Sequence, residues 1–232
     1  MSTKLVLFDI DGTLLLTAGA GRRAILAAVG EEVGPSVAFG GVRFDGKTDP
    51  QIVTELLEAA GHSGPHPTRR LENLCRRYVA LLERELQQPS TGTALMPGVA
   101  ALLDRLETET GVVLGLLTGN LAEGAALKLR SAGLDPARFQ VGAYGSDHAD
   151  RPELPPIAAQ RAERYFGRQP SGAEVVIIGD TPADIACGSC IGARAIGVAT
   201  GAYSIADLRS CGAYAAFQDL SDTERVLEAI LR

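Results

Sequence analysis

The sequence contains no tryptophan, few aromatic residues, few cysteines and no long apolar run. Aromatic residues make up 5% of the 232 residues, and there are 4 cysteines. No apolar stretch approaches the roughly 18 residues that a membrane-spanning helix needs, which predicts a cytoplasmic protein without a membrane partner. Cys187 and Cys190 lie close together within an expected helix. We interpret them as buried packing residues and not as redox or metal-binding thiols.

Positive charge is also in short supply. The chain has 22 Lys and Arg residues against 28 Asp and Glu residues, which gives a formal net charge of -6. Proteins that bind nucleic acids hold the phosphate backbone mainly through clustered Lys and Arg side chains. The charge balance therefore argues against a nucleic-acid partner, and we expect a small-molecule substrate and a monomer or homodimer.

Short apolar runs alternate with amphipathic stretches of helical length along most of the chain. The expected strands are residues 4–8, 112–117, 139–143, 174–178 and 194–198. The expected helices between and after them are residues 98–109, 121–132, 154–166, 182–191 and 222–231. This alternation predicts an α/β fold, with a doubly wound parallel sheet in a Rossmann-like core.

The region from Thr17 to Pro89 breaks this alternation, because its pattern is mostly helical. The candidate helices are residues 19–29, 50–60 and 68–86. We expect an all-helical cap domain at residues 17–92, inserted into an α/β catalytic core formed by residues 1–16 and 93–232. A stretch rich in Pro, Ser, Thr and Gly at residues 88–93 is the expected linker back to the core.

Two aspartates, Asp9 and Asp11, follow the first expected strand in the motif FDIDGTL at residues 8–14. Ligand sites of open parallel sheets form at the carboxyl ends of strands, and Gly12 lets the chain turn away there. Two carboxylates at such a site suit the hydrolysis of a phosphate monoester. Phosphate monoesters are among the most slowly hydrolysed compounds, so an enzyme that hydrolyses them needs several catalytic groups. Asp9 can serve as a nucleophile and Asp11 as a general acid and base. A strand-ending turn with solvated carboxylates is the alternative for this motif taken alone.

Two further polar motifs follow expected strands. The motif LLTGN places Thr118, Gly119 and Asn120 before a helix, where a hydroxyl and backbone amides can bind a phosphoryl oxygen. The same residue types are also ordinary turn and capping residues. The motif GDTPADI at residues 179–185 supplies Asp180 and Asp184 as oxygen ligands for Mg²⁺. A helix cap and a favourable first-turn charge are the alternative for these two residues, and both roles are compatible.

In their order and spacing, these three motifs resemble those of the haloacid dehalogenase superfamily, in its phosphatase branch with an inserted helical cap. The resemblance spans nearly the whole chain. It implies a phosphoglycolate phosphatase-like hydrolase, with Asp9 as the nucleophile and Asp11 as the acid-base residue. It also implies that Mg²⁺ is held by Asp9, the main-chain carbonyl of Asp11 and Asp180, with Asp184 in support.

The family's third motif usually contains a lysine, and the chain has no lysine after Lys128. Arg151, in the segment DRPE at residues 150–153, is the predicted substitute, because a guanidinium can bridge a carboxylate and a phosphoryl oxygen. The phosphate-binding residues predicted from the motifs are Gly12, Thr118, Gly119, Asn120 and Arg151. The dehalogenases of the superfamily do not need an acid-base carboxylate such as Asp11, so a phosphohydrolase or phosphomutase is favoured.

The segment GVRFDGKT at residues 41–48 matches the phosphate-loop pattern of nucleotide hydrolases. Such a loop needs a buried strand before it and a helix directly after it, whereas residues 35–39 make a poor strand and Pro50 disfavours helix at Asp49. We place the segment in the cap, where Lys47 either contacts the substrate's non-transferring end or is a solvated surface residue. A sugar phosphomutase of the beta-phosphoglucomutase type and a non-catalytic binding module on the same fold stay open as alternatives.

Overall fold

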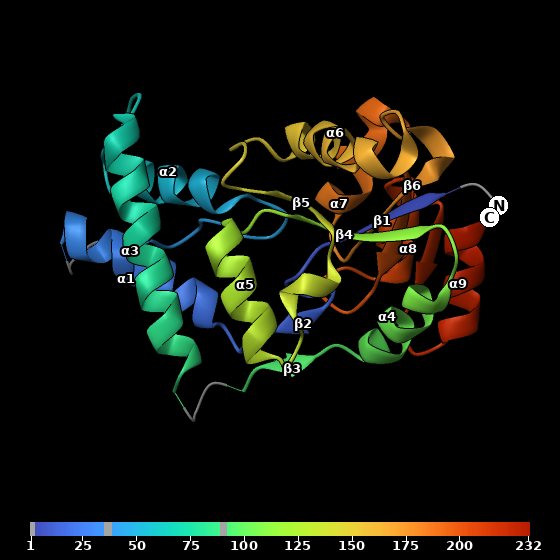
Figure 1. The fold of residues 1–232 in the computed structure, drawn as a ribbon. Helices are drawn as coiled ribbons and strands as arrows, with labels where there is room; N and C mark the ends of the chain where they lie inside the picture. The colour runs from blue at the N-terminus through green and yellow to red at the C-terminus, as the bar shows by residue number, and fades with distance from the viewer. Residues whose placement is uncertain (1–2, 35–38, 89–91) are drawn as a thin grey trace.

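A six-stranded parallel sheet forms the centre of the core in the computed structural model, which describes residues 3–34, 39–88 and 92–232 (Figure 1). In chain order its strands are β1 (Lys4–Phe8), β4 (Val112–Thr118), β5 (Val141–Tyr144), β6 (Val175–Gly179), β7 (Arg194–Val198) and β8 (Ala215–Phe217). Their spatial order is β5-β4-β1-β6-β7-β8, and every neighbouring pair is parallel. The predicted fold class is therefore confirmed.

Helices cover both faces of the sheet, which explains why the strands are apolar runs without alternation. Successive side chains of a strand point to opposite faces, so Val6 and Phe8 of β1 pack on one side and Leu5 and Leu7 on the other. The helices on the first side are α4 (Val99–Thr108), α5 (Ala122–Ser131) and α9 (Thr223–Leu231). Those on the second side are α6 (Leu154–Phe166) and α7 (Pro182–Cys187).

The cap consists of three helices with an apolar cluster of their own, at the left in Figure 1. They are α1 (Ala20–Val33), α2 (Asp49–Ala59) and α3 (Thr68–Leu86). The chain passes to and from the cap through β2 (Leu15–Leu16) and β3 (Ala94–Leu95), which pair antiparallel. We propose that this pair of strands marks the borders between core and cap expected at residues 17 and 92. Of the expected linker at residues 88–93, residues 89–91 lie outside the described part.

Helix α2 begins at Asp49, so the prediction that Pro50 disfavours helix there is wrong. Thr48 is the N-cap residue and accepts a hydrogen bond from the backbone N–H of Gln51 at 3.2 Å. Pro50 occupies the first turn, where a backbone N–H has no partner within the helix and its loss does no harm. Residues 39–48 contain no strand. Residues 35–38 lie outside the described part.

Other differences from the sequence-based expectations concern short elements. Strand β5 starts at Val141, two residues later than expected, because a 3-10 turn at Pro136–Arg138 precedes it. The expected helix at residues 182–191 ends at Cys187 and continues as the 3-10 turn Gly188–Ile191. Cys187 is buried but Cys190 is exposed, so the expected burial of Cys190 is wrong. Its side chain lies beyond the end of α7, near the carbonyl of Pro152.

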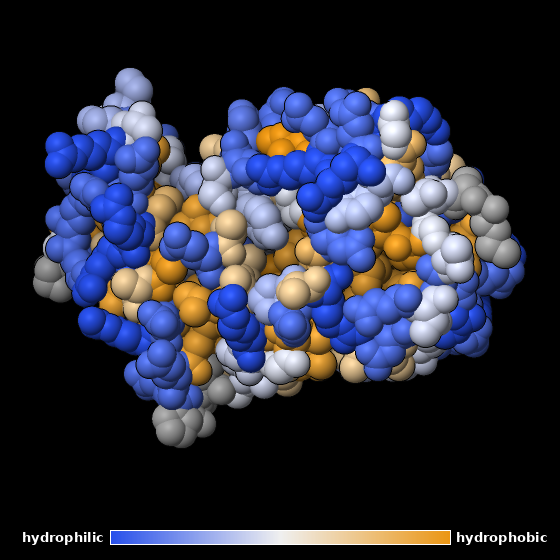
Figure 2. Space-filling view, viewed as in Figure 1, coloured by the Kyte–Doolittle hydropathy of each residue, from blue (hydrophilic) through white to orange (hydrophobic). Residues whose placement is uncertain are grey.

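The strand order reverses at β1, and this reversal determines where a ligand site forms. After β1 the chain builds β4 and β5 on one side, and it then returns to build β6, β7 and β8 on the other. Loops therefore leave the carboxyl ends of β1 and β6 in opposite directions, and the crevice between them is the usual ligand site of such sheets. Figure 2 shows mainly hydrophilic residues on the viewed face, with smaller apolar areas between them. Within the described residues, no helix combines the length and the apolar character needed to span a bilayer.

Substitution of Gly98 tests whether its close approach to the backbone of Leu220 and Ser221 constrains the core. Gly98 is the N-cap residue of α4 with a φ of 82°, and a Cβ there would overlap the backbone of Leu220 and Ser221. Gly133 has a similar φ of 78°, but a Cβ there would meet nothing within 4 Å. We expect Gly133→Ala to lower the free energy of unfolding by about 1 kcal/mol. Gly98→Ala should lower it by about 1–3 kcal/mol more, because the overlap adds to the backbone strain.

Urea unfolding followed by circular dichroism measures both changes. Equal destabilisation by the two substitutions would show that the contact with Leu220 and Ser221 does not constrain the fold.

Candidate active site

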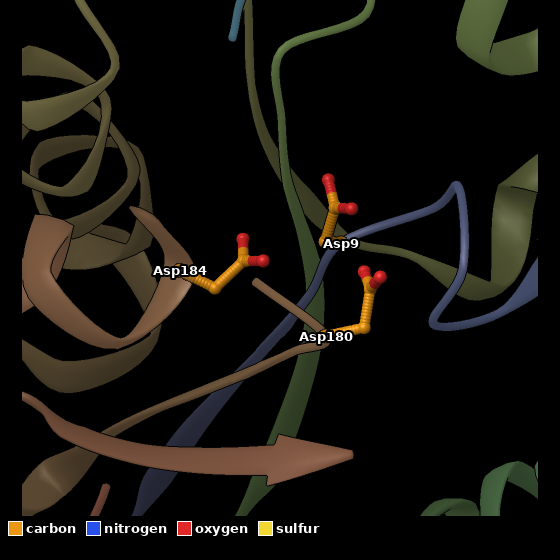
Figure 3. A group of neighbouring side chains, drawn as sticks. All are labelled: Asp9, Asp180 and Asp184. Atoms are coloured by element: carbon orange, nitrogen blue, oxygen red, sulfur yellow. The ribbon is translucent and has the colours of Figure 1, made fainter. Parts of the chain in front are cut away.

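Three buried aspartates meet at the crevice (Figure 3). Asp9 is the first residue after β1, and its backbone N–H donates to the carbonyl of Ile178 in β6 at 2.9 Å. Asp180 is the first residue after β6, and Asp184 lies in the first turn of α7. One carboxylate oxygen from each residue lies within 4.8 Å of the others. The pairing of β1 with β6 thus brings together residues that are far apart in the sequence.

The turn after β1 is shaped around Asp180. Gly12 has a φ of 82°, and a Cβ at this position would lie 2.5 Å from Oδ2 of Asp180. Only glycine therefore permits both the turn and the approach of this carboxylate. The hydroxyl of Thr13 donates to Oδ1 of Asp180 at 3.2 Å, which holds the carboxylate beside Asp9.

Arg151 lies at the centre of the aspartate cluster. It comes from the 3-10 turn Arg151–Glu153 that precedes α6, and it is buried. Its Nη2 atom donates to Oδ1 of Asp9 at 3.1 Å and also to Oδ1 of Asp184. Its Nε atom is buried and has no hydrogen-bond partner among the described residues. The structure therefore places Arg151 beside the expected nucleophile and leaves the N–H of its Nε atom without an acceptor among the described residues.

The charges of this cluster are not balanced by protein groups alone. Burial raises the pKa of Asp180 to about 8, and the carboxylates of Asp9 and Asp184 add to the rise. Burial also raises the pKa of Asp9 to about 6, although the charge of Arg151 opposes it. Three carboxylates thus face a single guanidinium. A divalent cation that prefers oxygen ligands, such as Mg²⁺, fits both the donor atoms and the missing charge.

Asp11 has a different set of partners from Asp9, although both line the same pocket. Its Oδ2 atom accepts from Nζ of Lys128 at 2.6 Å and from Nδ2 of Asn120 at 2.8 Å. Lys128 also donates to Oδ1 of Asn120 at 2.6 Å. Burial opposes the charge of Lys128, but the carboxylates of Asp11 and Asp49 raise its pKa above the ordinary value. Lys128 and Asn120 thus hold the carboxylate of Asp11 from two sides.

Lys128 is a site residue that the sequence analysis missed. It lies on α5 and is only 4% exposed. Its neighbours on the same helix face, Ala125 and Leu129, pack in the apolar core. A lysine on an otherwise apolar helix face was the signal that could have identified it, because a buried ammonium group needs a partner.

The motif after β4 lies beside Asp11. Thr118 ends the strand and is fully buried, and its Oγ1 atom accepts from Nδ2 of Asn120 at 2.8 Å and from the backbone N–H of Asn120 at 3.3 Å. Gly119 and Asn120 line the pocket, whereas Thr118 does not. Thr118 is thus placed behind Asn120, one layer further from the pocket than expected.

The cap closes the opposite side of the pocket, which has a volume of about 260 Å³. The backbone N–H of Asp49 donates to the carbonyl of Gly119 at 2.8 Å, and Oδ2 of Asp49 accepts from the backbone N–H of Leu121 at 2.8 Å. Burial raises the pKa of Asp49 to about 6, against the opposing charge of Lys128. The sequence analysis assigned no role to Asp49, because its burial depends on how the cap sits on the core.

Lys47 also lines the pocket, as part of the cap loop that precedes α2. Its ammonium group forms an ion pair with Glu55 of α2. The same loop contacts the core through Gly46, where a Cβ would lie 2.5 Å from that of Ala183. The loop is therefore at the expected place, but the charge of Lys47 already has a partner in the cap.

The chain belongs to the family of haloacid dehalogenase-like hydrolases, whose pattern matches residues 3–192. A phosphoglycolate phosphatase from Cereibacter sphaeroides (strain ATCC 17029) is 30% identical over 192 residues, which is 82% of each chain. These matches confirm the resemblance and the expected class of enzyme, a phosphatase.

Solved structures agree with the fold. The structure of a predicted phosphoglycolate phosphatase from Haemophilus somnus matches with a TM-score of 0.69 and 18% identity, over 98% of this chain and 99% of that chain. The structure of CbbY from Rhodobacter sphaeroides in complex with phosphate matches with a TM-score of 0.68 and 20% identity, over 95% and 96%. Because their sequence identities to this chain are low, the two structures support the fold alone.

Substitution of Lys128 by methionine tests its contact with Asp11. Lys128→Met keeps the length of the side chain but removes the ammonium group that holds Asp11 and Asn120. We expect kcat for the release of phosphate from an aryl phosphate to fall by about 10²-fold, because an acid-base residue that is poorly oriented loses most of its effect. KM should change less.

Arg130→Met is the matched control, because Arg130 is exposed on the same helix. Equal kcat values for the Lys128 variant and the parent protein, with both folded by circular dichroism, would contradict a positioning role.

Proposed function

We propose that the protein hydrolyses a small phosphate monoester, with phosphoglycolate as the leading candidate, through an aspartyl-phosphate on Asp9. One observation carries this proposal: Asp9 is buried in contact with Arg151 and beside Asp180 and Asp184, and it lines the same pocket as Asp11. A nucleophile, a cation for the phosphoryl group, a metal site and an acid-base group thus converge on one small cavity. That combination fits phosphoryl transfer to a carboxylate.

The reaction has two steps. The cycle starts with Asp11 protonated: a carboxylate oxygen of Asp9 attacks phosphorus, the bond from phosphorus to the alcohol oxygen breaks, and Asp11 gives its proton to that oxygen. A water molecule then transfers a proton to the Asp11 carboxylate and attacks phosphorus, and the bond from phosphorus to Asp9 breaks, which releases inorganic phosphate and restores the carboxylate of Asp9. Asp11 returns to its starting protonation state only after the second step, so its orientation by Lys128 and Asn120 serves both steps.

The phosphoryl group would be bound mainly by Arg151. The unpartnered Nε atom of Arg151 is a buried donor beside Asp9, and a buried donor without an acceptor is unfavourable. A phosphoryl oxygen supplies that acceptor, which supports Arg151 as the substitute for the family's lysine. The backbone of Gly119 and Asn120 completes the proposed phosphate site, with Thr118 behind Asn120 and Gly12 shaping the turn beside Asp180.

Mg²⁺ would be held by Asp9, Asp180 and the main-chain carbonyl of Asp11. Asp184 plays a supporting part, since its carboxylate accepts from Arg151 and from the hydroxyl of Thr181 at 2.7 Å. The ion would neutralise negative charge on the phosphoryl oxygens.

The size of the pocket and the named relatives support a small substrate. A volume of about 260 Å³ lies below the range of roughly 300–1,000 Å³ typical of sites for drug-sized ligands. The complete set of aspartates at one pocket speaks against a binding module without catalysis. We further propose that the protein acts in the cytoplasm as a monomer or homodimer, and its 4 free cysteines agree with a reducing compartment.

Substitution of the nucleophile tests the proposed function. With Mg²⁺ present, the parent protein should release phosphate from phosphoglycolate faster than from other members of a panel of phosphorylated metabolites. Asp9→Asn should abolish release from all of them, because an amide cannot replace the carboxylate as nucleophile. Phosphate is measured colorimetrically and the fold by circular dichroism. Turnover by Asp9→Asn near the parent rate would overturn the mechanism, and preference for another ester would overturn the substrate.

Removal of the metal tests the proposed Mg²⁺ site with a readout that does not depend on turnover. Mg²⁺ should raise the melting temperature of the parent protein, because the ion binds only the folded site. In Asp180→Asn this rise should be lost, while the metal-free variant melts above the metal-free parent. The reason is that burial and like charges raise the pKa of Asp180 to about 8, so its charge destabilises the folded state.

Asp104→Asn is the control, because this substitution removes the same charge from a carboxylate that is exposed on α4. Treatment with a chelator should also stop phosphate release, and Mg²⁺ should restore it. An unchanged rise in the Asp180 variant would remove Asp180 from the metal site.

A further inference from the structure

Four cationic side chains line the pocket, and three of them already have carboxylate partners. The four are Arg22, Lys47, Lys128 and Arg151. Lys47 pairs with Glu55, Lys128 with Asp11, and Arg151 with Asp9 and Asp184. The guanidinium of Arg22 has neither a hydrogen bond nor an ion pair with any described residue. It is therefore the cation of the pocket lining whose charge is left for a ligand.

Arg22 is oriented by an aromatic ring. Its guanidinium carbon lies 4.3 Å from the centroid of the Phe44 ring, a favourable stacking of a cation on a π face. Phe44 packs against the apolar cluster of the cap, so its ring is held in place beside the exposed side chain of Arg22. The neighbouring carboxylate, Asp45, pairs instead with Arg43 at 3.3 Å. The stacked guanidinium thus keeps its edge N–H groups for another acceptor.

The charge of Arg22 is unfavourably placed on its helix. It lies in the first turn of α1, a turn without acidic residues. A positive charge there is unfavourable, because the helix macrodipole is positive at its N-terminus. Gly19 and Gly21, which flank this part of α1, also line the pocket, and a Cβ on Gly21 would lie 3.2 Å from Nζ of Lys128. The absence of side chains at these positions keeps space open between Arg22 and the core.

The two ends of the pocket differ in origin. The groups proposed to bind the phosphoryl group, Asp9, Arg151 and Asp180, come from the core, whereas Arg22 and Phe44 come from the cap. A substrate with its phosphoryl group at Asp9 therefore directs its alcohol part towards the cap. Any charged group on that part would meet Arg22 and not Lys47, whose charge is paired.

We propose that Arg22 binds a carboxylate on the non-transferring part of the substrate, so that the preferred substrates are phosphate monoesters of hydroxy acids. This inference rests on the proposed phosphatase function and goes further, because it assigns the specificity to one residue and one class of leaving group. Stacked on Phe44, the guanidinium presents a planar pair of N–H donors that suits a carboxylate. The earlier candidate, Lys47, has no such role in this assignment.

A pair of matched substrates tests the assignment. Phosphoglycolate and ethyl phosphate have the same two-carbon chain, but only the first carries a carboxylate. Arg22→Gln should lower kcat/KM for phosphoglycolate by about 10-fold or more, mainly through KM, since a charge-assisted pair is lost. The same variant should change kcat/KM for ethyl phosphate by less than about 2-fold, because that substrate never made the contact. Arg69→Gln, an exposed position on α3 of the cap, is the charge-matched control.

A binding measurement separates this inference from the proposed function. The affinity of phosphoglycolate for the Asp9→Asn protein is measured by calorimetry, with and without Arg22→Gln, so that no turnover is needed. A loss of about 10-fold or more supports the assignment even if the parent protein proves unable to hydrolyse the ester. Unchanged affinity, absence of binding, or an equal loss of kcat/KM for both substrates would overturn it.

Discussion

The repulsion among buried carboxylates is the constraint around which the site is built. Asp9, Asp180 and Asp184 are buried near one another, and Asp11 and the buried Asp49 line the same pocket as Asp9 and Asp180. Carboxylates removed from water resist ionisation, and each neighbouring charge adds to the effect. Arg151 and Lys128 are the buried cations that oppose it. These two cations do not neutralise all the buried carboxylates. The remaining negative charge is the physical reason to expect a metal ion close to the nucleophile.

The two buried cations divide the site into two functional halves. Arg151 holds Asp9 and Asp184, which belong to the proposed nucleophile and metal cluster. Lys128 holds Asp11, the proposed acid-base residue, and its charge is shared with Asp49 of the cap. Asp49 also bonds the backbone of Gly119 and Leu121, so the cap contacts the half that holds the proposed acid-base residue. The contacts of the cap with the core thus lie beside the residues that orient Asp11.

The cap contributes residues to the lining of the pocket. It supplies Asp49 and Lys47 at the contact with the core, and Arg22 and Phe44 at the end of the pocket proposed for the alcohol part of a substrate. Families with a common core and different caps can therefore keep the chemistry and change the substrate. In this protein, the unpaired guanidinium of Arg22 is the cap feature that we propose to distinguish an ester with a carboxylate from an ester of the same size without one.

The sequence by itself determined the sheet, the order of its motifs and the aspartates at the strand ends. Buried strands must be apolar, and the carboxyl ends of parallel strands meet at one edge, so Asp9, Asp11 and Asp180 could be assigned to one crevice without a structure. Arg151 could be predicted as a site residue because the lysine usual in the family's third motif is absent from the chain. Its catalytic role stays a prediction. Asp49 and Arg22 could not be assigned, and Lys128 could be identified only as a buried cation that needs a partner, since their significance depends on which helix face meets which loop. Only the tertiary structure decided that Lys47 is paired and Arg22 is not, because ion pairing between side chains depends on distances that the packing of the cap helices and loops creates.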